Sequence, residues 1–188
     1  MGRTDEGWDW FLSAHQRNPD SVQILLDWSD ALMEQACQEQ SQGAEDYERR
    51  YVEAKEKIQQ AAQLDYWNTS PLRALGNLLL ELEQPQQALD QFELALRLDP
   101  YDEFAYVGKG KSLRKLNRDV EAANAYERAL VFQPNYRWLL TELGELFQRL
   151  ERHNEAVIKL KQALEIDPRD ARTSHLLADS LRKIGSAP

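Results

Sequence analysis

The string from Ala105 to Ser112 is the part of the chain that most resembles a catalytic or nucleotide-binding motif. It ends in Gly110-Lys111-Ser112, like a loose phosphate-binding loop, whose chemistry needs glycine-rich backbone amides between a strand and a helix. The first glycine of that motif is missing, and the apolar spacing places the string inside a helix with no strand before it. Nucleotide binding is therefore not expected.

The three histidines and the single cysteine form no catalytic or metal-binding set. His15, His153 and His175 are widely separated, and none stands at metal-ligand spacing from another histidine or from Cys37. No histidine is placed to activate Cys37, so we interpret it as a small packed or partly exposed residue and not as a nucleophile. These residues predict a protein that is not an enzyme, with no cofactor and no metal.

The acidic composition of the chain disfavours a nucleic acid as its partner. The chain of 188 residues holds 23 Lys and Arg against 32 Asp and Glu, and a net charge of −9 is unfavourable for binding the phosphate backbone of a nucleic acid. The acidic excess lies at the beginning, because residues 1–66 hold 6 basic and 14 acidic side chains whereas residues 67–188 hold 17 and 18. A basic surface is expected only in the second part.

Hydropathy and cysteine content indicate a soluble protein of a reducing compartment. The mean hydropathy is −0.68, and no apolar run approaches the roughly 20 residues of a membrane-spanning helix. The first residues, Met1 to Glu6, contain no apolar signal core, and a single cysteine excludes an internal disulfide. We expect no membrane insertion and a cytoplasmic location.

The chain repeats itself with a period of 34 residues. The segments ALRLDP, ALVFQP and ALEIDP end at three equally spaced prolines, Pro100, Pro134 and Pro168. Each unit has a glycine at its eighth position, alanines at its twentieth and twenty-seventh, and a large apolar residue at its twenty-fourth. The glycines are Gly76, Gly110 and Gly144, and the large residues are Phe92, Tyr126 and Leu160.

Each unit also has the apolar spacing of two helices. In the first unit Leu72, Leu75 and Leu79 recur at helical intervals, a polar break follows at residues 83–85, and a second periodic segment begins at Ala88. Small residues at the crossing let the two backbones approach, and the proline ends the second helix because it cannot continue the hydrogen-bond ladder. The sequence thus predicts antiparallel helix hairpins.

These residues resemble the tetratricopeptide repeat family, whose signature positions are all met in three consecutive units. The resemblance implies an all-α fold, a right-handed superhelical stack of antiparallel helix hairpins with a C-terminal capping helix. It also implies a concave groove, lined by the first helix of each hairpin, as the usual site for an extended peptide or a partner helix.

The same frame extends to both ends, so we expect residues 1–188 to form one domain. Residues 1–19 are expected to form a helix like the second helix of a hairpin, and residues 20–66 a divergent repeat with an inserted loop near 40–46. Three regular units are expected over 69–102, 103–136 and 137–170, and a capping helix over 171–185. Leu177, Ala178 and Leu181 fill the signature places of that last helix. Two interpretations of residues 1–19 stay open, a native half-cap and the cut edge of a longer protein.

Positions 2, 5, 9, 12 and 13 of each first helix point away from the packing face, at about 100° per residue, and are the expected groove positions. Basic and aromatic residues stand side by side there, which favours an acidic or C-terminal peptide with an apolar anchor. The alternative is a solvated face whose aromatic residues pack against a neighbouring unit. The candidate residues are Arg73, Asn77, Phe104, Lys111, Arg114, Lys115, Trp138, Thr141, Glu145 and His175.

The resemblance also suggests a two-carboxylate clamp, which some family members use to hold the C-terminal carboxylates of heat-shock chaperones. Arg73 and Asn77 match the lysine and asparagine of its first unit. Gly108 replaces the asparagine of the next unit, whereas Trp138 and Glu142 replace the lysine and arginine of the one after. Glu142 would repel a carboxylate, so we reject this clamp and keep the acidic ligand.

Two functions from different classes follow from this pattern. The first is a non-catalytic adaptor, scaffold or assembly factor that binds a protein or peptide partner in the groove. The second is a self-associating structural module, in which the acidic first hairpin or the open N-terminal edge docks on the basic groove of another copy. A third interpretation is a regulatory fragment of a larger protein.

Overall fold

The computed structural model describes residues 3–44 and 47–185, with side chains described from residue 9 onward. All regular secondary structure in these ranges is α-helical. Residues 45 and 46 of the predicted loop near 40–46, and the side chain of every residue before Asp9, lie outside the described part. The chain divides into two compact units, Met1–Pro100 and Tyr101–Pro188, which are described separately. The single domain expected over 1–188 stays a prediction.

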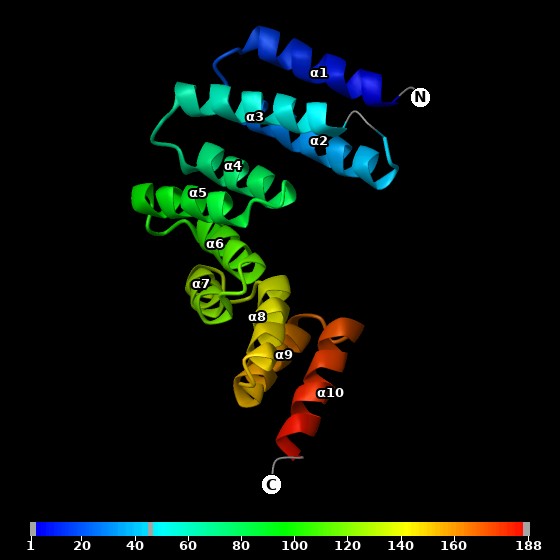
Figure 1. The fold of residues 1–188 in the computed structure, drawn as a ribbon, viewed down its shortest axis with the longest axis vertical. Helices are drawn as coiled ribbons and strands as arrows, with labels where there is room; N and C mark the ends of the chain where they lie inside the picture. Colours follow the sequence, from blue (N-terminus) through cyan, green and yellow to red (C-terminus); the bar gives the residue numbers. More distant parts are fainter. Residues whose placement is uncertain (1–2, 45–46, 186–188) are drawn as a thin grey trace. The chain divides into compact units, whose positions relative to one another are not determined.

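The first unit contains one helix followed by two hairpins (Figure 1). Its helices are α1 (Arg3–Arg17), α2 (Val22–Ser41), α3 (Tyr47–Leu64), α4 (Thr69–Glu81) and α5 (Pro85–Leu98). Helices α2 and α3 pack together as a long hairpin, α4 and α5 as a shorter one, and α1 packs on α2. Figure 1 shows α2 and α3 running side by side, with α1 along them.

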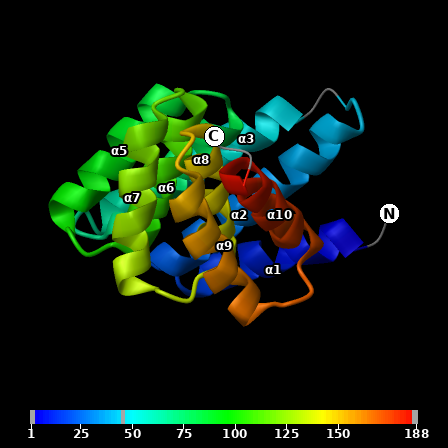
Figure 2. The ribbon, with the colours of Figure 1, turned by 90° about the horizontal axis from the view of Figure 1, so that it is seen from below.

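The second unit contains two hairpins and a final helix. Its helices are α6 (Glu103–Lys115), α7 (Asp119–Phe132), α8 (Arg137–Arg149), α9 (His153–Ile166) and α10 (Ala171–Gly185). Helix α6 pairs with α7 and α8 with α9, and α10 packs on both α8 and α9. Figure 2 shows the same unit from below, with α10 lying along α9.

Local sequence signals explain where several helices begin. Ser21 accepts a hydrogen bond from the backbone N–H of Ile24 at 3.3 Å, and Asn68 accepts one from Ser70 at 2.9 Å. Asp102 accepts one from Ala105 at 2.9 Å. Each side-chain oxygen satisfies a backbone donor that the first turn of a helix leaves without a partner. Pro85 begins α5, where a missing N–H costs nothing.

The two helices of a hairpin touch at the repeated glycine. A Cβ atom on Gly76 would lie 2.6 Å from Phe92 Cζ, and one on Gly144 would lie 2.6 Å from Leu160 Cδ2. The clash at Gly110 with the ring of Tyr126 would be closer still. No real Cβ is tolerated at these separations, so glycine is required by the packing and not by the backbone angle.

The large side chains beneath these glycines form the core of their hairpins. Phe92 is 1% exposed, and Tyr126 and Leu160 are fully buried. In the first hairpin Ser29 takes the place of the glycine, and it is buried with its hydroxyl donating to the Leu26 carbonyl at 2.7 Å. The predicted all-α stack of helix hairpins is confirmed.

In α10 the signature residues Leu177, Ala178 and Leu181 are half-buried or exposed. Thr173 and Ser180 are fully buried, whereas Leu181 is 47% exposed and Ala178 is also exposed. The two buried residues are small and find hydrogen-bond partners on α8, so α10 contacts α8 through them.

We predict that Gly110→Ala lowers the melting temperature, although alanine gains about 1 kcal/mol over glycine in a helix. Overpacking against Tyr126 costs about 1–3 kcal/mol and outweighs that gain. The measurement is thermal unfolding followed by circular dichroism. Gly185→Ala is the matched control, because a Cβ there meets no atom within 4 Å. Equal melting temperatures for the two variants would contradict the packing argument.

Candidate partner-binding surface

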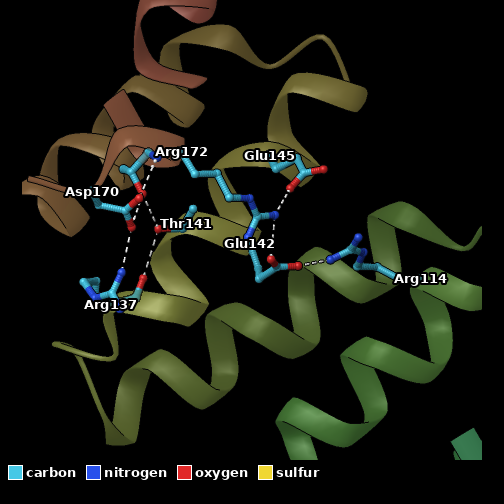
Figure 3. A network of polar contacts seen from close by, with 8 residues as sticks. Arg114, Arg137, Thr141, Glu142, Glu145, Asp170 and Arg172 are labelled. Atoms are coloured by element: carbon cyan, nitrogen blue, oxygen red, sulfur yellow. Dashed lines mark hydrogen bonds and ion pairs between the residues drawn. The ribbon is translucent and has the colours of Figure 1, made fainter. Parts of the chain in front are cut away.

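A polar network joins three helices of the second unit (Figure 3). At its centre is Glu142 on α8, whose side chain is 7% exposed. Its Oε2 accepts a hydrogen bond from Arg114 Nη1 of α6, and its Oε1 lies 2.8 Å from Arg172 Nη2 of α10. Arg172 also donates to Glu145 of α8. One nearly buried carboxylate therefore links the first helices of successive hairpins with the final helix.

The pairing keeps both guanidinium groups charged. Burial is the largest single effect and would lower the pKa of Arg114, but the charge and hydrogen bond of Glu142, together with Tyr126 and Glu145, outweigh it and the net pKa is raised. The pKa of Arg172 is raised for the same reason, with burial opposed by Glu142 and then by Glu145. A nearly buried carboxylate is costly unless it is paired, and here it is paired twice.

A second set of contacts holds α10 on α8. Arg137 Nη1 donates to Asp170 Oδ2 at 2.7 Å, as Figure 3 shows. Asp170 in turn accepts from the N–H of Thr173 at 3.2 Å and from its hydroxyl at 3.0 Å. Further along, Gln148 Nε2 donates to Ser180 Oγ at 2.7 Å. These bonds explain why Thr173 and Ser180 of α10 are buried.

The burial of Thr141 and the ion pairing of Glu142, both on α8, differ from what the sequence predicts. Thr141, a candidate groove residue, is 3% exposed, and its hydroxyl oxygen lies 2.8 Å from that of Thr173. It is covered because α10 crosses α8 at this point, so we leave it out of the proposed surface. Glu142 is not the isolated repulsive charge that the sequence suggested, since two guanidinium groups offset it.

The other candidates of the second unit lie nearer to solvent. Lys111 is exposed on α6, and its Nζ lies 4.9 Å from the centre of the half-buried Trp138 ring on α8. Lys115 is exposed in the last turn of α6, and Phe104 is 52% exposed in its first turn. His175 on α10 is exposed, with its Nδ1 3.5 Å from Asp179 Oδ2. Lys111 and Trp138 are thus the cation and aromatic ring that the structure brings together.

The first unit holds the remaining candidates. Asn77 is exposed on α4, and Arg73 is half-buried with its Nη2 donating to Ser70 Oγ at 2.9 Å. That Arg73 and Asn77 lie in one groove with the basic residues of the second unit stays a prediction.

The bridging role of Glu142 and Arg172 does not follow from the sequence pattern. Each stands at an ordinary surface position of its own helix, and only the neighbouring helix turns the two residues into an ion pair. The available signal was that Glu142 stands at the sixth repeat position, where the two preceding units have the small residues Ala74 and Gly108.

The motif residues take positions that fit no catalytic set. The string from Ala105 to Ser112 lies within α6. Cys37 is exposed, with its Sγ 3.3 Å from the hydroxyl oxygen of Tyr51. In the described part of the chain, no three His, Cys, Asp or Glu side chains are grouped so as to hold a metal ion. None of the described helices has the length and apolar character needed to cross a bilayer.

Comparisons with known proteins agree with this architecture. A family model described as tetratricopeptide repeat matches residues 74–102 and 139–170. No curated protein matches the chain. A solved thermophilic repeat protein from Thermus thermophilus superposes with a TM-score of 0.72 at 19% identity, over 96% of this chain and 92% of that one. The MamA protein superposes with a TM-score of 0.68 at 18% identity, over 87% and 82%.

One similar structure contains a bound peptide. It is the first such domain of Spaghetti (RPAP3), solved with the HSP90 peptide SRMEEVD. It superposes with a TM-score of 0.60 at 18% identity, over 63% of this chain and 94% of that one. At this identity the likeness establishes the fold alone.

We predict that Glu142→Gln destabilises the second unit by about 2 kcal/mol, because charged hydrogen bonds to two guanidinium groups are lost. Glu155→Gln is the control, since it removes a more exposed pair with Arg152, and ion pairs of that kind contribute little to stability. Chemical denaturation measures both. The account fails if the two substitutions cost the same.

We predict that the effect of Asp170→Asn depends on pH. The hydrogen bond from the Thr173 N–H, with help from its hydroxyl and from Arg137, lowers the pKa of Asp170 below its ordinary 3.8. A lowered pKa in the folded state stabilises the fold above the ordinary value, and this stabilisation is lost as pH falls through the lowered one. The wild type should therefore melt higher near neutral pH and converge with the variant in strong acid. A difference independent of pH would contradict this assignment.

Proposed function

We propose that this chain is a tetratricopeptide repeat protein and a non-catalytic interaction module that binds a protein or peptide partner, which the match of the repeat model to residues 74–102 and 139–170 supports. The partner segment is acidic and carries an apolar anchor. It binds across α6 and α8, on a surface that we call the Lys111 surface and define as Lys111, Arg114, Lys115 and Trp138. The single cysteine suits a reducing compartment, so the proposal places the protein in the cytoplasm.

The observation that carries the proposal is the placement of Lys111 over the Trp138 ring. A cation held at an aromatic face offers a partner both a charge and an apolar plane. Lys115 adds a second exposed cation on the same helix, and Arg114 keeps 28% of its side chain exposed while paired with Glu142. Aromatic residues and arginine are the side chains most often responsible for binding energy in interfaces.

The electrostatics of the Lys111 surface support an acidic partner. Glu142 is the carboxylate paired with Arg114, and its charge is already offset by Arg114 and Arg172. An approaching carboxylate therefore meets exposed lysines before it meets an uncompensated acid. Such charges act mainly by steering encounter, whereas burial of the anchor on Trp138 supplies the lasting affinity.

The proposal does not include a chaperone clamp. The peptide in the Spaghetti (RPAP3) structure shows that a domain of this fold takes a peptide with adjacent glutamates. In this chain Gly108, Trp138 and Glu142 stand where that clamp needs amide or cationic side chains. The adaptor role rests on the Lys111 surface, and the alternatives of groove-mediated self-association and of a regulatory fragment stay predictions.

A binding assay tests the proposal. The probe is a fluorescein-labelled polyglutamate peptide that ends in leucine, followed by fluorescence anisotropy. We expect the double variant Lys111→Glu with Lys115→Glu to weaken binding on the order of tenfold or more, because it reverses two exposed charges. Arg114 is left unchanged because its removal would disturb the pair with Glu142.

The control variant carries the same charge change on another helix, with Lys159→Glu and Lys161→Glu on α9. It should bind like the wild type, and a polyglutamine probe should bind neither protein. Equal weakening by both double variants would mean that only net charge matters and would overturn the proposed surface.

A further inference from the structure

The outward side of α10 is apolar. Leu181 is 47% exposed and Ile184 is 37% exposed, Ala178 is exposed and Leu177 is half-buried. Leu177, Leu181 and Ile184 are spaced by four and three residues, which places them on one stripe of the helix. Thr173 and Ser180, which contact α8, lie on the adjoining side of the helix. We call the outward stripe, Leu177, Ala178, Leu181 and Ile184, the α10 face.

The α10 face corresponds to the surface that earlier first helices use to pair with a second helix. Ala178 stands at the eighth repeat position, where Gly76, Gly110 and Gly144 are buried against a large side chain. Ala178 is exposed because no described residue of the chain occupies that place. The face therefore has the small residue and flanking leucines that receive a helix.

Helix α1 also has apolar side chains that are only partly covered. Phe11 stands at the twenty-fourth repeat position, where Phe92, Tyr126 and Leu160 are at most 1% exposed, yet Phe11 is only half-buried. Its ring stacks on Trp28 of α2 at 5.9 Å between centroids, which uses one side of the helix. Trp10 is 56% exposed, and Ala14, one turn further, is half-buried. Helix α1 thus keeps an apolar edge open.

The charges at the ends of α1 and α10 are complementary for an antiparallel pair. The exposed Asp9 is the described acidic side chain in the N-terminal half of α1, and in sequence this half also holds Arg3, Asp5 and Glu6, a net charge of −2, whereas Arg182 and Lys183 stand in the last turn of α10. In an antiparallel hairpin the beginning of the second helix lies beside the end of the first. The acidic end of α1 would then meet the basic end of α10, and both charges also suit the helix dipoles.

We propose that α10 of one copy binds α1 of a second copy as an antiparallel helix pair, with the Trp10–Ala14 edge on the α10 face. The contact is heterologous, so it joins copies head to tail into chains or closed rings. Pairing of α10 with α10 is disfavoured because it would bring Arg182 and Lys183 of each copy toward Arg172 of the other. The contact is separate from the Lys111 surface and does not depend on ligand binding.

Multi-angle light scattering of the full chain tests the proposal. The wild-type mass should rise with protein concentration and fall with added salt, because part of the attraction is electrostatic. Leu181→Glu and Trp10→Glu should each weaken association on the order of tenfold. Ile158→Glu is the matched control, since Ile158 is 54% exposed on α9 and lies outside the proposed contact.

A mixing experiment separates this contact from a symmetric one. Leu181→Glu blocks α10 and leaves α1 intact, whereas Trp10→Glu does the reverse. An equimolar mixture should therefore form a dimer under conditions where each variant alone is monomeric. Circular dichroism must first show wild-type helicity, and Ala178→Arg replaces Leu181→Glu if that variant loses helix content.

Three outcomes would overturn the proposal. The first is a wild-type mass that stays monomeric at every concentration. The second is an equal loss of association in the Ile158→Glu control. The third is a mixture that stays monomeric while the wild type associates, because a head-to-tail contact must be restored by complementary intact ends.

Discussion

In three hairpins a glycine on the first helix lies against a large side chain of the second, with no room for a Cβ atom between them. Phe92, Tyr126 and Leu160 fill this place and are nearly or fully buried. The contact sets how closely the two helices approach and which side of each first helix turns inward to its partner. All other positions of the first helices are then assigned by helical geometry, including those that face a neighbouring hairpin or solvent.

In the second unit some exposed-side positions of α8 pack against neighbouring helices, whereas others are proposed to bind the partner. Thr141 of α8 contacts Thr173 of α10, and Glu142 pairs with Arg114 and Arg172. Both residues therefore contribute to the packing of the unit. Trp138, four residues before Glu142, stays half-buried and lies beneath Lys111. Helix α10 contacts α8 through Thr173 and Ser180, whereas its Ala178 and Leu181 stay exposed. Partner binding is thus proposed on α6 and α8, whereas self-association is proposed between α10 and α1 of a second copy.

The sequence was sufficient to predict the hairpins, because the period of 34 residues and the glycines at the eighth position report a contact within each repeat. It was not sufficient to predict which candidate surface residues stay accessible. A helical projection assigns faces to one helix at a time, whereas the burial of Thr141 depends on how α10 crosses α8. The capping helix was predicted from the apolar pattern of α10, and Ala178 and Leu181 stay exposed because no described second helix covers them.

The most direct test of this division is a nuclear magnetic resonance titration of the isotope-labelled chain with the polyglutamate peptide that ends in leucine. The account predicts that the indole N–H signal of Trp138 and the backbone signal of Lys111 shift with added peptide. The backbone signals of Thr141 and Thr173, which are covered by helix packing, should change much less. Shifts confined to α9, or changes in Thr173 as large as those in Trp138, would contradict the assignment of Lys111 and Trp138 to the partner and of Thr141 to the fold.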